Sequence, residues 1–289
     1  MELGRVGVWL GQLGLRPAAE EREAARELEA LGYGTLWFGE SPLNREAFAH
    51  AGLLLAATER VVVATGIASI WLRSAAAAAN GAAALAEAYP GRFVLGLGVS
   101  HAPLVARIGR EYRRPVATMR AYLEAMETTE YRAAPPAERA PVVLAALAPP
   151  MLALVRECAD GAHPYLVTPE HTRRAREALG TGLLLAPEQG FVLERDRDRA
   201  REAARAHLAT YLEAENYRRS WLHLGFDEED FADGGSDRLV DALVAWGDEE
   251  AVCSRLEEHL AAGADHVCVQ ALGADPLGQL RRLAPALLG

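Results

Sequence analysis

The sequence predicts an α/β fold of the TIM-barrel type, a (β/α)8 barrel. Along its 289 residues, eight short apolar runs alternate with longer segments of helical character. The runs are rich in β-branched residues and lack polar alternation, which is typical of parallel strands buried on both faces. Several end in small residues followed by a polar group, as expected where strand ends face a ligand. An open doubly wound sheet would give the same alternation, and the count of eight favours the barrel.

Local signals define the strands and helices of the first 130 residues. A helix opens at Pro17, whose fixed φ suits a first turn, and ends at Gly32. The following strand ends at Glu40, and Pro90 with the glycine after it stops an Ala-rich helix. The polar stretch 101–114 is predicted to be a long loop over the end of the sheet. The predicted strands here are 5–10, 34–40, 61–69 and 92–98, and the helices are 17–31, 44–57, 74–89 and 115–130.

The rest of the chain repeats this pattern with one interruption. Helix 195–212 is charged and amphipathic, which indicates a solvated outer face. Between about 213 and 247, ahead of the eighth strand, the repeat breaks and aromatic residues stand among acids. An insertion of that length is usually functional, as a lid or an interface, and residues 1–289 otherwise form one domain. The predicted strands here are 141–147, 162–165, 182–186 or 182–192, and 266–270, and the other helices are 151–159, 168–179, 248–262 and 276–288.

Composition excludes several classes of function. The formal net charge of −10 would repel polyanions, so neither nucleic acid nor an anionic membrane is an expected partner. No apolar run approaches the roughly 20 residues that span a bilayer, and we expect a cytoplasmic protein. All 30 basic residues are arginine, which excludes Schiff-base enzymes and a Walker-type phosphate loop. The three cysteines are scattered and no HxH or HExxH spacing occurs, so we predict no metal site.

Polar side chains next to predicted strand ends are the candidate chemical groups. Glu40 ends the second strand, where barrel active sites are built, and it is either a catalytic carboxylate or a cap for a neighbouring amide. Of the eight histidines, three follow predicted strands directly: His101, His163 and His171. His207 lies within a predicted helix and is interpreted as a surface or packing residue.

Two short segments suggest how a ligand could be held. The sequence GLGVS at 96–100 resembles a dinucleotide fingerprint, but the position of its third glycine is His101 and a polar loop follows, which argues against a Rossmann site. Small residues there would instead let a flat ring approach the backbone. The run from Thr168 to Thr172 fits a well-capped helix, and the same free amides could bind a phosphate.

An ordered set of motifs extends over essentially the whole chain, although no single motif is decisive. They are GYGTLWFGES, ATGIASIWLRS, YPGRFVLGLGVSH, LAALAPPMLALVRECADGAHPYLVTPEHTRRARE and AGADHVCVQ, with NYRRSWLHLGF inside the insertion. This set resembles the luciferase-like monooxygenase superfamily. More narrowly, it is similar to the actinobacterial branch of deazaflavin-dependent oxidoreductases.

The resemblance implies a barrel that binds coenzyme F420 (8-hydroxy-5-deazaflavin), or alternatively FMN, at the carboxyl ends of its strands. The family's bulge after strand three, often a non-prolyl cis peptide behind the ring, falls on Gly66 and Ile67. The family's phosphate contacts fall on Thr168 and His171. The ring-edge and tail contacts fall on Gly98, Val99, Ser100 and His101 after strand four, and on Ala145, Ala146 and Leu147 after strand five.

The sequence departs from the family at its proton-transfer positions. Dehydrogenase members have a histidine after the strand-two acid, where this chain has Ser41, and some have an acid after strand one, where it has Gly11-Gln12-Leu13. Removing a hydride from an alcohol needs a base for the hydroxyl proton. We therefore expect reduction of an activated C=C or C=N bond of a small molecule rather than alcohol oxidation, with Glu40, His101 or solvent supplying a proton.

Two alternatives stay open at this point. One is an FMN-dependent monooxygenase on the same scaffold. The other is a cofactor-free barrel that acts as a binding or accessory subunit, which the loss of the histidine at Ser41 and the lack of an evident arginine near the phosphate contacts would favour. The resemblance also implies a homodimer.

Overall fold

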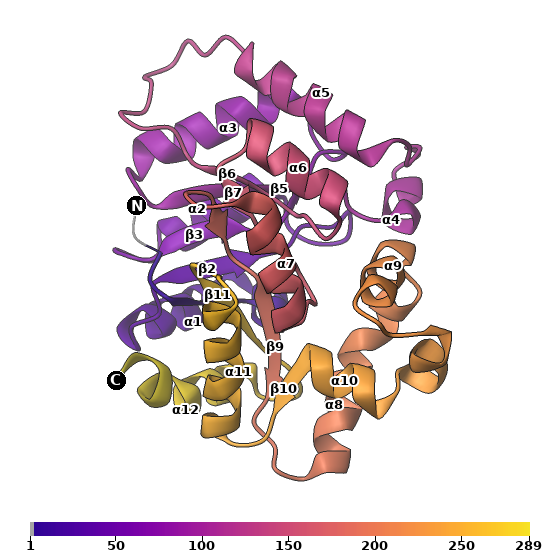
Figure 1. Ribbon diagram of the computed structural model, residues 1–289. Helices are drawn as coiled ribbons and strands as arrows, with labels where there is room; N and C mark the ends of the chain where they lie inside the picture. Colours follow the sequence, from indigo (N-terminus) through magenta and orange to yellow (C-terminus); the bar gives the residue numbers. More distant parts are fainter. Residues whose placement is uncertain (1–2) are drawn as a thin grey trace.

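The computed structural model describes residues 3–289 and contains one parallel sheet that curls round, with helices outside it (Figure 1). The strand order is β10-β9-β11-β1-β2-β3-β5-β6-β7-β8, with β4 beside β5. The strands are β1 (Val6–Trp9), β2 (Thr35–Phe38), β3 (Val62–Thr65), β4 (Ala68–Ser69), β5 (Phe93–Gly98), β6 (Val142–Leu144), β7 (Gly161–Ala162), β8 (Leu184–Leu185), β9 (Glu188–Val192), β10 (Val244–Trp246) and β11 (Val267–Ala271).

One chain segment connects the last strand of this path, β8, to β9 near its other end. β8 pairs with β7, and only Ala186 and Pro187 separate β8 from β9, which pairs with β11. The backbone continues this pairing, because the amide of Cys268 donates to the carbonyl of Pro187 at 2.8 Å. The carboxyl ends of the parallel strands therefore gather round one mouth, where a ligand site can form.

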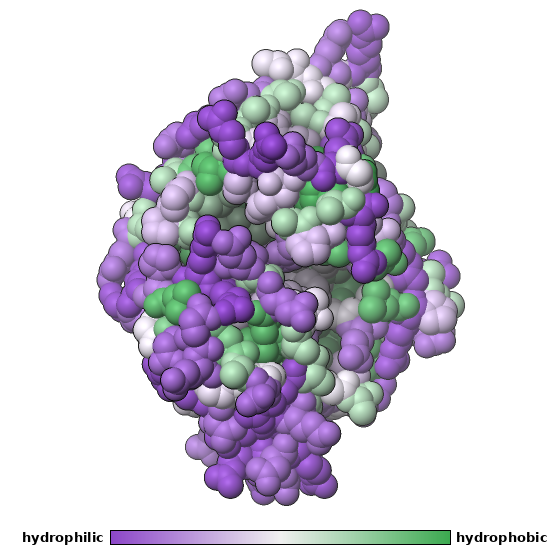
Figure 2. All heavy atoms as spheres, turned by 90° about the vertical axis from the view of Figure 1, so that its right-hand side faces the viewer, coloured by the Kyte–Doolittle hydropathy of each residue, from purple (hydrophilic) through white to green (hydrophobic). Residues whose placement is uncertain are grey.

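Helices cover the outside of the sheet. They are α1 (Ala18–Ala30), α2 (Ala47–Leu55), α3 (Ala75–Ala88), α4 (Ala102–Arg107), α5 (Pro115–Glu127), α6 (Pro149–Cys158), α7 (Pro169–Leu179), α8 (Arg197–Leu212), α9 (Glu215–His223), α10 (Asp237–Leu243), α11 (Glu249–Ala261) and α12 (Pro276–Leu288), with 3-10 turns at Gly11–Leu15 and Glu228–Gly234. Within residues 3–289, none of the helices is long and apolar enough to cross a membrane. The face that carries α4 and α9 is mostly hydrophilic, and apolar residues show in hollows near its middle (Figure 2).

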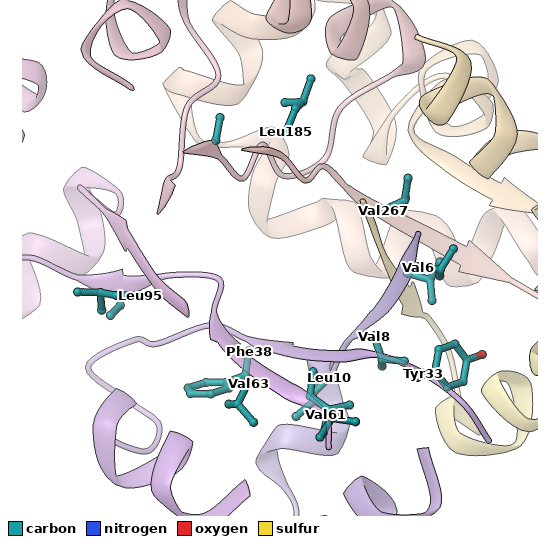
Figure 3. Packing of buried hydrophobic residues seen from close by; sticks show 14 of the residues in the cluster. Val6, Val8, Leu10, Tyr33, Phe38, Val61, Val63, Leu95, Leu185 and Val267 are labelled. Carbon is teal, nitrogen blue, oxygen red and sulfur yellow. The ribbon is translucent and has the colours of Figure 1, made fainter. Parts of the chain in front are cut away.

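Strand alternation divides the core into two layers. Val8, Phe38 and Val63 point away from the curl of the sheet and pack against the helices (Figure 3). A smaller cluster that includes Trp37 and Cys268 contains the residues on the other face of the strands. A third cluster, centred on the fully buried Trp221, joins α8, α9 and α10. The insertion therefore has an apolar core of its own, which fixes it against the barrel.

Three features of the structure differ from the sequence predictions. The predicted loop 101–114 contains α4. Predicted strand 61–69 is divided into β3 and β4 by a cis peptide bond, and 182–192 is divided into β8 and β9. The last part of the predicted insertion contains a strand that the sequence analysis did not predict, because Val244–Trp246 forms β10 and pairs with β9. The sequence VAW is too short an apolar run to stand out from the acidic and aromatic residues around it.

Candidate functional site

A cis peptide bond between Gly66 and Ile67 lies at the carboxyl end of β3, where the sequence predicted the bulge. The indole Nε1 of Trp9 donates to the carbonyl of Gly66 at 3.2 Å. A Cβ on Gly66 would lie 2.8 Å from Trp9 Nε1 and 2.8 Å from His163 Nε2, so no side chain fits there. Glycine at this position lets the peptide lie between these two rings.

Small residues from the neighbouring strands extend this surface. A Cβ on Gly98 would overlap the Ile67 side chain and lie 3.3 Å from the Cβ of Ala145. Residues at the carboxyl ends of β3, β5 and β6 therefore meet, and we call Gly66, Ile67, Gly98 and Ala145 the ring floor. Ile67 and Ala145 are half-buried and present an apolar surface at the mouth.

The segment after β5 turns sharply beyond the ring floor. Ser100 has a positive φ of 56°, and the carbonyl of Val99 accepts a hydrogen bond of 2.7 Å from Trp71 Nε1. His101 Nδ1 lies 3.2 Å from Asn216 Oδ1, and burial lowers the pKa of His101. The imidazole of His101 therefore contacts the insertion, not the ring floor.

Glu40 is buried, and neighbouring groups use both of its carboxylate oxygens. Oε1 accepts from the amide of Ala47 and Oε2 from the amide of Ser69, each at 2.9 Å. The guanidinium of Arg73 also bonds Oε1, and the Arg73 side chain is 7% exposed. The structure thus favours the capping interpretation of Glu40, which joins α2, β4 and Arg73.

The predicted phosphate contacts after β7, Thr168 and His171, lie next to Leu147, which was predicted as a ring-edge and tail contact after β6. Thr168 caps α7 by accepting from the amide of His171 at 3.3 Å. His171 Nε2 lies 2.9 Å from the carbonyl of Leu147, to which it must donate. Its Nδ1 is then an unprotonated acceptor that is buried without a partner, and burial lowers the pKa of His171. Neutral His171 therefore holds the Leu147 carbonyl through Nε2, and the Thr168 hydroxyl still has a proton to donate.

A cavity of about 220 Å³ opens at the mouth beside Trp9. It combines aromatic and uncharged polar side chains from the loops after β1, β2 and β7 and from α8 and β11. Its lining consists of Trp9, Gly11, Gln12, Gly14, Leu15, Phe38, Gly39, Asn44, His50, Tyr165, His207, Tyr211 and Gln270. The sequence analysis named none of these as site residues, and it interpreted His207, which lies in α8, as a surface or packing residue.

Four of these residues form a hydrogen-bonded group that we call the tyrosine cluster: Tyr165, His207, Tyr211 and Gln270. Tyr165 Oη donates to Gln270 Oε1 at 2.7 Å and lies 3.1 Å from His207 Nε2. Tyr211 Oη donates to Tyr165 Oη at 3.4 Å. Burial raises the pKa of Tyr165 well above its usual value and lowers the pKa of His207 to about 4. Both groups are neutral at pH 7.

A buried carboxyl lies near the tyrosine cluster. Glu188 Oε2 accepts from the amide of Leu166 at 3.1 Å, and Oε1 is buried without a partner. Burial raises the pKa of Glu188 to about 8, against the smaller lowering effect of that amide. Glu188 is therefore mostly protonated at neutral pH, so it brings little negative charge to the mouth.

Sequence signals for the tyrosine cluster do exist. Tyr165 ends the predicted sixth strand and Gln270 ends the predicted eighth, so both occupy positions where barrel sites are built. His207 and Tyr211 are four residues apart and share a face of α8. The rest of α8 is strongly charged, so the sequence pattern did not reveal the face that is directed at the cavity.

A family model described as luciferase-like monooxygenase matches residues 2–266, more than half of the chain. The chain belongs to this family. The predictions of the family and of an oxidoreductase are therefore confirmed. Among curated proteins, the chain is 25% identical over 305 residues to 5,10-methylenetetrahydromethanopterin reductase of Archaeoglobus fulgidus, covering 90% of this chain and 91% of the relative.

Two solved structures show the same fold. An F420-dependent secondary alcohol dehydrogenase, solved with an F420–acetone adduct, matches with a TM-score of 0.79 and 17% identity over all of both chains. The oxygenating constituent of 3,6-diketocamphane monooxygenase from Pseudomonas putida, in complex with FMN, matches with a TM-score of 0.72 and 14% identity over 98% of both chains. At these identities the matches establish the fold alone.

Proposed function

We propose that this protein binds the 5-deazaflavin coenzyme F420 on the ring floor and reduces an activated C=C or C=N bond of a small organic molecule. The observation that carries the proposal is the ring floor itself, a surface of small and apolar residues at the strand ends that Trp9 joins to the cavity. F420 is proposed as the coenzyme because a protein with the same fold, the secondary alcohol dehydrogenase, is F420-dependent.

The residues present fit a planar tricyclic ring and its tail. Ile67, Gly98 and Ala145 support a flat group, because the glycine keeps the floor free of a side chain that would displace Ile67. Trp9 fixes the Gly66 carbonyl behind this surface. The Thr168 hydroxyl and the amide of Glu170 in the first turn of α7 would hold the tail phosphate. When bound, the coenzyme supplies the hydride at its C5, and the protein supplies position and electrostatics.

We also propose that the curled sheet is an eight-stranded barrel. In this interpretation β3 with β4, and β8 with β9, each count as one strand, and β10 is an addition beside β9. The insertion then runs from about 213 to 243 and ends where β10 begins.

The surroundings of the candidate proton-transfer groups favour reduction over alcohol oxidation. Ser41 offers no imidazole after β2, the Glu40 carboxylate is occupied by two amides and Arg73, and His101 contacts Asn216. None of the three is placed as a base for a substrate hydroxyl. We accordingly propose Glu40 as a positioning residue for the ring floor, since it bonds the amide of Ser69 in β4.

Fluorescence titration of the purified protein with F420 and with FMN tests the proposal. We expect F420 to bind more tightly than FMN. Gly98→Ala places a methyl group against Ile67 and should weaken F420 binding at least tenfold. Gly52→Ala is the matched control, because a Cβ there meets nothing within 4 Å and the site lies inside α2. Alanine is the better helix former, so this control should bind F420 normally.

Other outcomes of the titration would contradict the proposal. Tight binding of FMN without binding of F420 would favour the monooxygenase alternative, which the FMN complex of the Pseudomonas putida protein supports. Micromolar binding of neither coenzyme would favour a cofactor-free accessory subunit.

A further inference from the structure

We infer that the Tyr165 hydroxyl protonates the substrate, and that the substrate is an uncharged molecule of about one ring that carries a conjugated carbonyl or an imine. This inference rests on the proposed function, because it assigns the proton that must accompany the hydride. No residue at the family's proton-transfer positions supplies that proton in this chain.

The position of Tyr165 is the first argument. Its ring lies 5.3 Å from that of Trp9, whose indole bonds the Gly66 carbonyl behind the ring floor. Tyr165 therefore borders the cavity on the side next to the ring floor, and a substrate between the two can reach the phenolic oxygen. Tyr165 Oη donates a hydrogen bond to Gln270 Oε1 at 2.7 Å. A substrate oxygen or nitrogen would replace Gln270 Oε1 as the acceptor of this hydrogen bond.

The surroundings of the phenolic oxygen suit a proton donor. With its own proton directed at Gln270, Tyr165 Oη can accept from His207 Nε2–H at 3.1 Å and from the Tyr211 hydroxyl at 3.4 Å. When the proton leaves, both groups can donate to the phenolate oxygen, which offsets part of the cost of burial that raises the pKa of Tyr165. His207 is half-buried on α8, so its second nitrogen can take a proton from solvent while Nε2 returns one to Tyr165.

The step balances for an imine as follows. The hydride from the reduced coenzyme forms a C–H bond at the imine carbon, and the C=N π electrons move to nitrogen. The nitrogen takes the proton from Tyr165, whose O–H bond breaks. The substrate is reduced, the coenzyme is oxidised, and His207 then reprotonates the phenolate with a proton that solvent replaces. For a conjugated carbonyl the hydride adds to the β-carbon, and the C=C π electrons shift so that the carbonyl becomes an enolate. The enolate oxygen takes the proton from Tyr165, and the enol then tautomerises to the saturated carbonyl compound by proton exchange with solvent.

The lining of the cavity defines the class of substrate. It contains no arginine, aspartate or glutamate, so a phosphate or carboxylate would be buried there without a counter-charge, which is costly. Its aromatic walls include Trp9, Tyr165 and Tyr211, which suit an unsaturated ring. At about 220 Å³ it is smaller than the usual 300–1,000 Å³ site for drug-sized ligands.

A binding experiment without coenzyme tests the site separately from the proposed function. Calorimetric titration with 2-cyclohexen-1-one should show binding, and its anionic analogue cyclohex-1-ene-1-carboxylate should bind at least tenfold more weakly. Tyr165→Phe removes one oxygen atom and should weaken cyclohexenone binding by about threefold to tenfold, the value of one hydrogen bond. Tyr131→Phe is the control and should match the wild type. Equal binding by wild type and Tyr165→Phe, or tighter binding of the carboxylate, would overturn the inference.

A rate experiment with the holoenzyme tests the proton step. Oxidation of reduced F420 by 2-cyclohexen-1-one should slow at least a hundredfold in Tyr165→Phe, with the Kd of F420 unchanged. His207→Gln, a change at a positioning residue, should slow kcat about tenfold and enlarge the solvent deuterium isotope effect. An unchanged rate in Tyr165→Phe would refute the assignment. If the wild type binds no F420, the proposed function fails, while the calorimetric result still decides whether the cavity takes neutral enones.

Discussion

Replacement of Glu40 by alanine separates its structural role from a catalytic one. Glu40→Ala removes the acceptor for two amides, those of Ala47 and Ser69, and leaves the Arg73 guanidinium buried without its main partner. Removing one partner of a buried ion pair lowers the free energy of unfolding by about 3–5 kcal/mol. Glu46, which is 53% exposed, also bonds Arg73 and remains, so the lower end of about 3 kcal/mol applies.

Urea unfolding at pH 7 measures this loss. For a protein of this length, a change of about 3 kcal/mol corresponds to a fall in Tm of roughly 5 °C. Adding Arg73→Ala to Glu40→Ala should recover part of the loss, because the unpaired guanidinium is then gone. F420 binding should also weaken in Glu40→Ala, because Ser69 lies two residues beyond Ile67. A loss of stability below 1 kcal/mol, together with a large fall in turnover and unchanged F420 binding, would refute this reasoning and make Glu40 catalytic.

Three further predictions concern the buried carboxyl, the insertion and the segment after β5. Because burial raises the pKa of Glu188 to about 8, the folded state holds this proton more tightly than the unfolded state. The free energy of unfolding should therefore fall by on the order of 4 kcal/mol as the pH rises from about 4.5 through 8. Glu188→Gln should flatten this dependence in urea titrations at pH 5 and 9, and an unchanged slope would show that Glu188 is not its source. Trp221→Ala should cost about 3–5 kcal/mol, because the fully buried indole also donates to the Leu166 carbonyl beside the tyrosine cluster. It should weaken cyclohexenone binding as well, and calorimetry with normal binding would argue against a link between the insertion and the cavity. His101→Gln should change turnover less than threefold, because His101 contacts Asn216, and a hundredfold loss in steady-state assays would restore a catalytic role.

Local sequence signals were sufficient to predict most of the fold. Continuous apolar runs such as 92–98 became strands, and proline or glycine marked the helix ends where expected, as at Pro115 and Gly180. The errors fall where tertiary contacts decide. Val244–Trp246 is a strand only because β9 presents a free edge to it. Residues 102–107 form a helix within a polar segment, with the buried Val105 as its anchor.

The part of the candidate site that could be predicted from the sequence is the part that glycines and the backbone form. Positions 66 and 98 are occupied by glycine, and neighbouring atoms leave no room for a Cβ at either position. The glycines themselves can be read from the sequence. The roles of side chains such as Glu40 and His171 depend on which amide or carbonyl lies beside them, which the sequence does not state. The tyrosine cluster joins residues up to 105 positions apart, so its members become one group only after the barrel has formed.

The most direct measurement of the central claim is a crystal structure of the protein with F420 bound. This account predicts that the tricyclic ring lies against the Gly66–Ile67 peptide, with C5 open to the cavity beside Tyr165 and the tail phosphate near Thr168. A ring bound elsewhere on the molecule, or a mouth closed by side chains over Ile67 and Gly98 with no coenzyme present, would contradict it.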